Sequence, residues 1–141
     1  MADTMAARKM ASKAAEKFKQ ALQHLERTGE LNALVALFSE DAVLSRQGKI
    51  ANGGGLETTR EFWGHYLASF QEIHSTFTST LIAEELVVLE WFSEGALVGG
   101  SPVNYGGVSL LLLDPSGRVK AFRTYFDSAA LEQFATDRRA S

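Results

Sequence analysis

The sequence of 141 residues contains no cysteine, and it contains only two prolines. Without cysteine the chain can form no disulfide bond, no thiolate metal site and no cysteine nucleophile. No apolar run approaches the roughly 20 residues of a membrane span, and the N-terminus lacks the apolar stretch of a signal peptide. These absences predict a cytoplasmic, single-domain protein that folds around an ordinary hydrophobic core.

The charges give no indication of a nucleic-acid or membrane partner. Lys and Arg number 14 and Asp and Glu number 17, so the formal net charge is −3. No basic stripe or face stands out, although binding to nucleic acid depends on one. No His and carboxylate residues show the spacing of metal ligands, such as His-x-x-x-His. We therefore expect no nucleic acid, no membrane, no metal and no cofactor.

In the first half of the chain, apolar residues recur with helical spacing. This pattern predicts a helix from Met10 to Thr28, a short helix over 31–38 and a third helix over 56–70. Two short strands are expected between the second and third helices, at 41–46 and 48–52. Residues 1–9 are small and polar, so we expect a flexible leader followed by one domain over 10–141.

In the second half, the period of the apolar residues changes to two. This alternation predicts four strands over 73–83, 86–98, 103–113 and 118–126, separated by turns rich in Gly and Pro. Asp127 or Ser128 then caps a helix that continues to about Ala135. Helices that precede an antiparallel sheet predict an α+β fold.

The segment GGVSLLLL (106–113) is apolar on both sides of its strand. An antiparallel sheet that is covered on one face only should alternate apolar and polar residues. The N-terminal helices can cover one face, so the other face is expected to meet a second copy of the chain. The residues expected on that outer face are Leu86, Val88, Phe92, Val108, Leu110 and Leu112.

Three stretches of the sequence resemble a known superfamily. GELNALVALFSEDAVL (29–44), TREFWGHYL (59–67) and GRVKAFRTYFD (117–127) are similar to the nuclear transport factor 2-like superfamily, and most closely to its SnoaL-like and ketosteroid-isomerase-like branch. The resemblance implies a cystatin-like α+β barrel, in which a cone-shaped, curved antiparallel sheet wraps around N-terminal helices. It also implies a deep apolar pocket and dimers through the convex sheet face.

The resemblance does not by itself select a function, because members include isomerases, polyketide cyclases, epoxide hydrolases, dehydratases and non-catalytic domains. Ketosteroid isomerases use an Asp base on the first strand, and this position aligns with Arg46 when Asp41-Ala42 is aligned with the family's Asp-Ala pair. Their oxyanion hole uses a Tyr and a protonated Asp, which correspond to Ala21 and Ser109. Steroid isomerisation needs a carboxylate and two donors, so this activity is not expected.

Limonene epoxide hydrolases resemble the last strand most closely. They carry Arg-Asp-Tyr-Phe-Asp where this chain has RTYFD (123–127), so the proton-donating Asp is replaced by Thr124. The Arg-x-Asp that activates water would fall on Trp91 and Ser93. The residues that help to hold the water would fall on Leu44 and Arg46. A neutral threonine cannot usefully donate a proton at pH 7, so this activity is not expected either.

Strand alternation, phased by these alignments, predicts which side chains face the pocket. The expected substrate-binding residues are Arg46, Trp63, Tyr66, Trp91, Ser93, Tyr105, Ser109, Phe122, Thr124 and Phe126. Such a cavity suits a flat or cyclic apolar molecule, with an anionic or carbonyl group near Arg46. Two alternatives remain open: the aromatic residues fill the space as core, or Arg46 lies at a solvated rim.

Two classes of function remain open. One is a cofactor-independent isomerase, cyclase or hydratase, in which Tyr105, Arg46 and Tyr66 polarise a carbonyl or position the substrate. The other is a non-enzymatic ligand-binding or dimeric association domain. His65 and His74 are weaker acid–base candidates. The feature that separates the two classes is whether a group able to transfer protons reaches the cavity.

Overall fold

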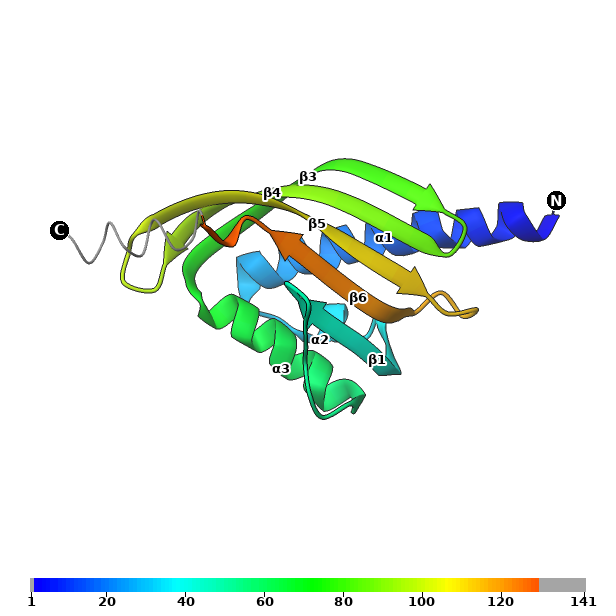
Figure 1. Cartoon of the computed structure of the whole chain (residues 1–141), viewed down its shortest axis with the longest axis horizontal. Helices are drawn as coiled ribbons and strands as arrows, with labels where there is room; N and C mark the ends of the chain where they lie inside the picture. Colours follow the sequence, from blue (N-terminus) through cyan, green and yellow to red (C-terminus); the bar gives the residue numbers. More distant parts are fainter. Residues whose placement is uncertain (1, 130–141) are drawn as a thin grey trace.

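The computed structural model describes residues 2–129 and shows an α+β fold, as predicted (Figure 1). Its strands form one curved sheet that is not closed into a barrel. In chain order the elements are α1 (Ala2–Thr28), α2 (Asn32–Val35), β1 (Phe38–Arg46), β2 (Lys49–Ile50), α3 (Gly55–Ala68), β3 (Phe70–Ala83), β4 (Leu86–Leu97), β5 (Pro102–Leu113) and β6 (Val119–Phe126).

The strand order across the sheet is β2-β1-β6-β5-β4-β3. Neighbouring strands are antiparallel except β1 and β6, which run parallel and bring Arg46 opposite Thr124. This pair corrects the expectation of a wholly antiparallel sheet. Parallel neighbours need a long crossover connection, and α3 with the four strands β2 to β5 provides one between β1 and β6. The pairing is important for the site because it adds the end of β1 to the concave face.

Several boundaries differ from those predicted. Residues 2–9, expected as a flexible leader, continue α1 as a helix because this segment is rich in alanine and other helix formers. The division into leader and domain stays a prediction. Phe38, expected in the second helix, instead begins β1 and pairs with Val119, where its ring is buried.

The predicted C-terminal helix lies largely outside the described residues. At its expected start, Asp127 Oδ1 accepts a hydrogen bond from the Ala129 backbone N–H at 3.1 Å. This is the interaction of a residue that caps a helix N-terminus. None of the described helices is long and apolar enough to cross a membrane.

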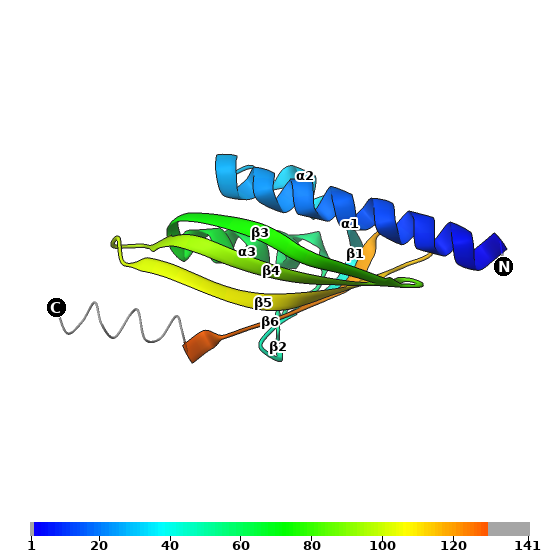
Figure 2. The same cartoon turned by 90° about the horizontal axis from the view of Figure 1, so that it is seen from above.

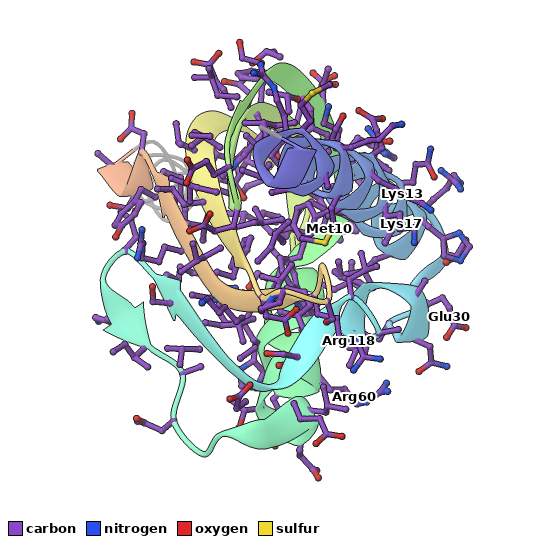
Figure 3. The ribbon with its side chains drawn as sticks, turned by 90° about the vertical axis from the view of Figure 1, so that its right-hand side faces the viewer. Met10, Lys13, Lys17, Glu30, Arg60 and Arg118 are labelled. Carbon is purple, nitrogen blue, oxygen red and sulfur yellow. The ribbon has the colours of Figure 1, made fainter. Side chains whose placement is uncertain are left out.

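The core lies between α1 and the concave face of the sheet. In Figure 2, α1 runs along one side of the sheet, and no helix of the described residues runs along the other. Phe18 and Leu25 of α1 are buried against Leu89, Leu111 and Phe122 of the sheet. Figure 3 shows Met10 directed from α1 toward the β5–β6 turn, while Lys13 and Lys17 point away from the core.

Gly107 in β5 makes room for the largest side chain of the sheet. It pairs with Trp91 on β4. A Cβ atom at this position would overlap the indole ring of Trp91 and would lie 2.5 Å from the Tyr125 carbonyl oxygen. The missing side chain therefore lets the Trp91 ring lie flat across β5 on the concave side.

We expect Gly107→Ala to lower the free energy of unfolding by about 1–3 kcal/mol, because an extra methyl group forces Trp91 and the β5–β6 pair apart. Urea unfolding followed by circular dichroism measures the change. Gly64→Ala is the matched control, since a Cβ at Gly64 meets nothing within 4 Å. Inside α3 it should stabilise by about 0.5–1 kcal/mol. A Gly107→Ala protein as stable as the wild type would contradict this packing.

Candidate functional site

A cavity of about 140 Å³ lies on the concave side of the sheet, between the sheet, α1 and α3. All ten residues expected from strand and helix phase line this cavity. The aromatic residues form its walls and leave space between them. Whether these residues bind a ligand stays a prediction. The remaining lining residues are Phe18, Leu22, Phe62, Ser69, Phe70, Ser75, Phe77 and Leu97.

Aromatic rings form two groups along the cavity. At one end, the rings of Trp63 and Phe122 lie 5.1 Å apart, and both contact the ring of Phe62. At the other end, the ring of Tyr105 lies 5.4 Å from that of Trp91 and 5.6 Å from that of Phe126. Edge-to-face contacts of this kind hold the rings at fixed angles. The cavity is therefore narrow, apolar and shaped by rigid side chains.

Arg46 is the cation of the cavity. Its guanidinium carbon lies 4.4 Å from the centre of the Phe62 ring. It forms no hydrogen bond or salt bridge with any other side chain in the described part of the chain. Burial lowers the pKa of Arg46, while the nearby Tyr105 and Tyr66 oppose that shift, and an arginine remains charged in proteins at neutral pH. Arg46 is thus half-buried. Its position is intermediate between the two expected alternatives, a buried ligand contact and a solvated residue at the rim of the cavity.

Tyr105 is a second donor without a partner. Its side chain is 6% exposed, and its hydroxyl group has no hydrogen-bond partner among residues 5–129. Burial raises the pKa of Tyr105, and the positive charge of Arg46 partly opposes this shift. The phenol is therefore a neutral O–H donor at pH 7. The hydroxyl group is not among the fully buried unpartnered atoms, so it is accessible from the cavity and free to donate to a ligand oxygen.

Glu26, on the last turn of α1, is hydrogen-bonded to the cavity wall. Its Oε2 accepts hydrogen bonds from Tyr66 Oη at 2.5 Å and from Ser75 Oγ at 2.6 Å, and its Oε1 accepts one from the Ser75 backbone N–H at 2.7 Å. Ser75 Oγ also lies 2.6 Å from Ser93 Oγ. Burial, followed by the negative charge of Glu26, raises the pKa of Tyr66.

Sequence reasoning did not find Glu26, although a signal was present. Glu26 follows Leu22 by four residues and therefore extends the apolar stripe of α1. A carboxylate at such a position is unusual unless it is paired. The residues that bind it lie on α3 and β3, and no pattern within α1 specifies them.

A second set of hydrogen bonds crosses the sheet. Trp91 Nε1 donates to Ser109 Oγ at 2.9 Å, and Ser109 Oγ lies 2.9 Å from Thr124 Oγ1. These are three of the positions at which the resemblance placed acid–base residues of related enzymes. Here neutral groups occupy them and largely satisfy one another.

The histidines lie outside this cavity. His65 is exposed and borders a separate groove beside Lys49, and His74 is exposed on β3. Among the described residues, no cluster of three or more His, Asp or Glu side chains could hold a metal ion.

The buried Trp63 Nε1–H has no hydrogen-bond partner among the described residues.

Comparison with known proteins gave one family match. The profile of the SnoaL-like domain matches residues 16–126. This segment extends from the middle of α1 to the end of β6 and so includes every cavity-lining residue. In a comparison with curated protein sequences, no protein matched.

Several solved structures have a similar fold. TerC co-crystallised with polyporic acid is 14% identical, with a TM-score of 0.73 over 89% of this chain and 97% of that chain. An LEH-like epoxide hydrolase from M. tuberculosis is 19% identical, with a TM-score of 0.70 over 90% of each chain. A ketosteroid isomerase-like protein from Catenulispora acidiphila DSM 44928, in complex with trimethylamine, is 20% identical, with a TM-score of 0.70 over 81% and 88%. At these identities the likeness shows the fold alone.

The raised pKa values of the two cavity tyrosines predict a loss of stability at alkaline pH. In the unfolded chain a tyrosine ionises near pH 10, whereas Tyr66 and Tyr105 keep their protons beyond that pH when folded. Their contribution is thus fully present below about pH 10 and is lost as the pH rises toward the folded-state values. Above about pH 10, we expect the free energy of unfolding to fall less steeply with pH in Tyr105→Phe than in the wild type, by up to about 1.4 kcal/mol per pH unit. Urea unfolding between about pH 8 and 11 measures this free energy. Parallel plots of it against pH for variant and wild type would contradict the prediction.

Proposed function

The chain belongs to the SnoaL-like domain family, and on that basis we propose that its cavity binds a small, largely apolar ring compound that carries an oxygen acceptor. One observation carries the proposal. Arg46 and Tyr105 line the same apolar cavity, and each has donor hydrogens that no described residue accepts. A carbonyl or carboxylate oxygen placed between them would accept both hydrogen bonds.

The size of the cavity limits the ligand. An apolar cavity of about 150 Å³ holds one benzene ring, and this cavity measures about 140 Å³. A single substituted ring therefore fits inside, whereas a fused polycyclic compound has to extend through the opening of the cavity or displace its walls. The rigid contacts among the aromatic rings make such movement costly.

Arg46 favours an acceptor that carries negative charge. Hydrogen bonds between a guanidinium and a carboxylate are roughly twice as strong as neutral ones. Arg46 is partly removed from water and lies on the Phe62 ring, so an anion meets a charge that is weakly screened. Ring carboxylates should consequently bind more tightly than the corresponding aldehydes.

A second candidate function is cofactor-independent catalysis, such as isomerisation, cyclisation or hydration. Glu26 favours it, because this carboxylate contacts Tyr66 directly behind the cavity wall. Arg46 and Tyr105 would stabilise an oxyanion that forms on the substrate. The fold shared with an LEH-like epoxide hydrolase supports this class, but Thr124 stands where those enzymes have their proton donor, so epoxide opening by that route is not part of the proposal.

Binding of benzoate and benzaldehyde tests the proposed function. We expect benzoate to bind the wild type and Arg46→Met to weaken its binding by about 10-fold or more, because a charge-assisted hydrogen bond is lost. Isothermal titration calorimetry measures the dissociation constants. Arg118→Met is the control, since Arg118 is exposed in the β5–β6 turn and does not line the cavity. Equal benzoate affinity in all three proteins would reject Arg46 as the anion contact.

The proposal includes a homodimer through the outer sheet face. Phe92 on β4 and Tyr125 on β6 are each 43% exposed there. Val88 on β4 pairs with Leu110 on β5, the strand between β4 and β6. This face is uncovered by the described helices (Figure 2). Apolar faces of this kind commonly mark contacts between copies.

Sedimentation velocity at micromolar concentration tests this association. We expect a dimer for the wild type and a monomer for Leu110→Lys, because a lysine at the centre of the apolar face would be buried without a partner. Asn104→Lys is the control: Asn104 is exposed on the same face of β5 but near its N-terminal end. A monomeric wild type would reject the dimer.

A further inference from the structure

The hydrogen bonds around Glu26 have a fixed direction. A carboxylate accepts hydrogen bonds and donates none, so the single hydroxyl protons of Tyr66 and Ser75 both point to Glu26. Ser75 has then used its only proton. Ser93 must therefore donate in the contact of 2.6 Å between the two serine oxygens.

Two oxygen atoms on this wall keep acceptor capacity as a result. Tyr66 Oη and Ser93 Oγ each donate their proton into the network and keep lone pairs that can accept, although Ser75 also contacts Tyr66 closely enough to oppose the rise of its pKa. Both residues line the cavity. The side chain of Ser93 is only 1% exposed, so water does not readily satisfy its oxygen. This wall offers acceptors and no hydroxyl donor.

The strands beside this wall offer donors, and Tyr105 on β5 pairs directly with Ser93 on β4. Arg46 on β1 and Tyr105 on β5 have unused N–H and O–H groups. Ser109 and Thr124 have two hydroxyl protons, and their mutual hydrogen bond uses one of them, so one remains. Because Trp91 Nε1 also donates to Ser109, part of the acceptor capacity of this pair is already filled.

We propose that Glu26 makes the Tyr66–Ser93 wall an acceptor surface, and that the ligand of this cavity is a hydroxylated ring compound with its O–H donor on that wall and its oxygen acceptor at Arg46 and Tyr105. The inference rests on the proposed function, because the acceptor end of the ligand is the one assigned there. It adds the second polar group and names Glu26 as the positioning residue that selects it.

The probes are matched pairs of ring aldehydes. The three hydroxybenzaldehyde isomers and the three fluorobenzaldehyde isomers are compared at about pH 6, where the phenol keeps its proton. Fluorine is close in size to a hydroxyl group but donates no hydrogen bond. We expect at least one hydroxyl isomer to bind the wild type about 3- to 10-fold more tightly than its fluoro counterpart, as measured by calorimetry or ligand-observed NMR.

Glu26→Gln tests the role of the carboxylate. The Ser75 backbone N–H holds an acceptor oxygen at the Oε1 position, so the amide NH₂ takes the Oε2 position and donates to Tyr66 and Ser75. The hydroxyl protons of Tyr66 and Ser93 then become free to point into the cavity, and the preference for the hydroxyl isomer should disappear. Glu30→Gln is the matched control, because Glu30 is exposed just beyond α1 (Figure 3).

Ser93→Ala provides an independent variant if Glu26→Gln does not fold. It removes one acceptor, leaves Glu26 with its three donors and should also reduce the preference. Equal binding of hydroxyl and fluoro isomers to the wild type would overturn the inference and leave the proposed function standing. A preference that survives in Glu26→Gln and in Ser93→Ala would also overturn it. No binding by either member of any pair would overturn the proposed function and this inference with it.

Discussion

The arrangement of the cavity depends on one carboxylate that joins three elements. Glu26 lies on the last turn of α1, and its two oxygens bind Tyr66 of α3 and Ser75 of β3. A partly buried carboxylate is stable only when donors replace the water it has lost, so the three elements have to meet at this point. The contact fixes the last turn of α1 against the open end of the curved sheet. The helix cannot slide along the sheet without leaving a charge uncompensated.

The sheet supplies the rest of the cavity through one glycine and one long-range strand pairing. Gly107 lets Trp91 lie across β5, which places a large ring on the wall without closing the space. The parallel pairing of β1 and β6 brings Arg46 beside Thr124. A cation thereby reaches an otherwise apolar concave face, although it is distant in sequence from the aromatic residues around it. Gly107, the ring of Trp91 and the side chain of Arg46 together shape this side of the cavity.

Much of this could be read from the sequence, and the failures have physical causes. The period of two placed Trp91, Tyr105 and Phe126 on one face, because successive side chains of a strand alternate. The parallel β1–β6 pair was missed because nothing local in either strand specifies its partner. Glu26 was missed for a related reason: its role depends on residues about 40 and 49 positions later in the chain. Patterns within one element predict which face is buried, whereas contacts between elements determine what a buried polar group does.

The replacement of acid–base residues by neutral ones changes what the cavity can recognise. A carboxylate on the sheet would bind protons and cations, and it would compete with Glu26 for the hydroxyl groups nearby. Ser109 and Thr124 instead bind each other and Trp91, so they add little charge and keep the middle of the cavity apolar. Charge is confined to Arg46 and to Glu26, which lies behind the wall that Tyr66 and Ser75 form. In the function proposed above, these polar groups orient the ligand, while the apolar lining contributes binding without direction.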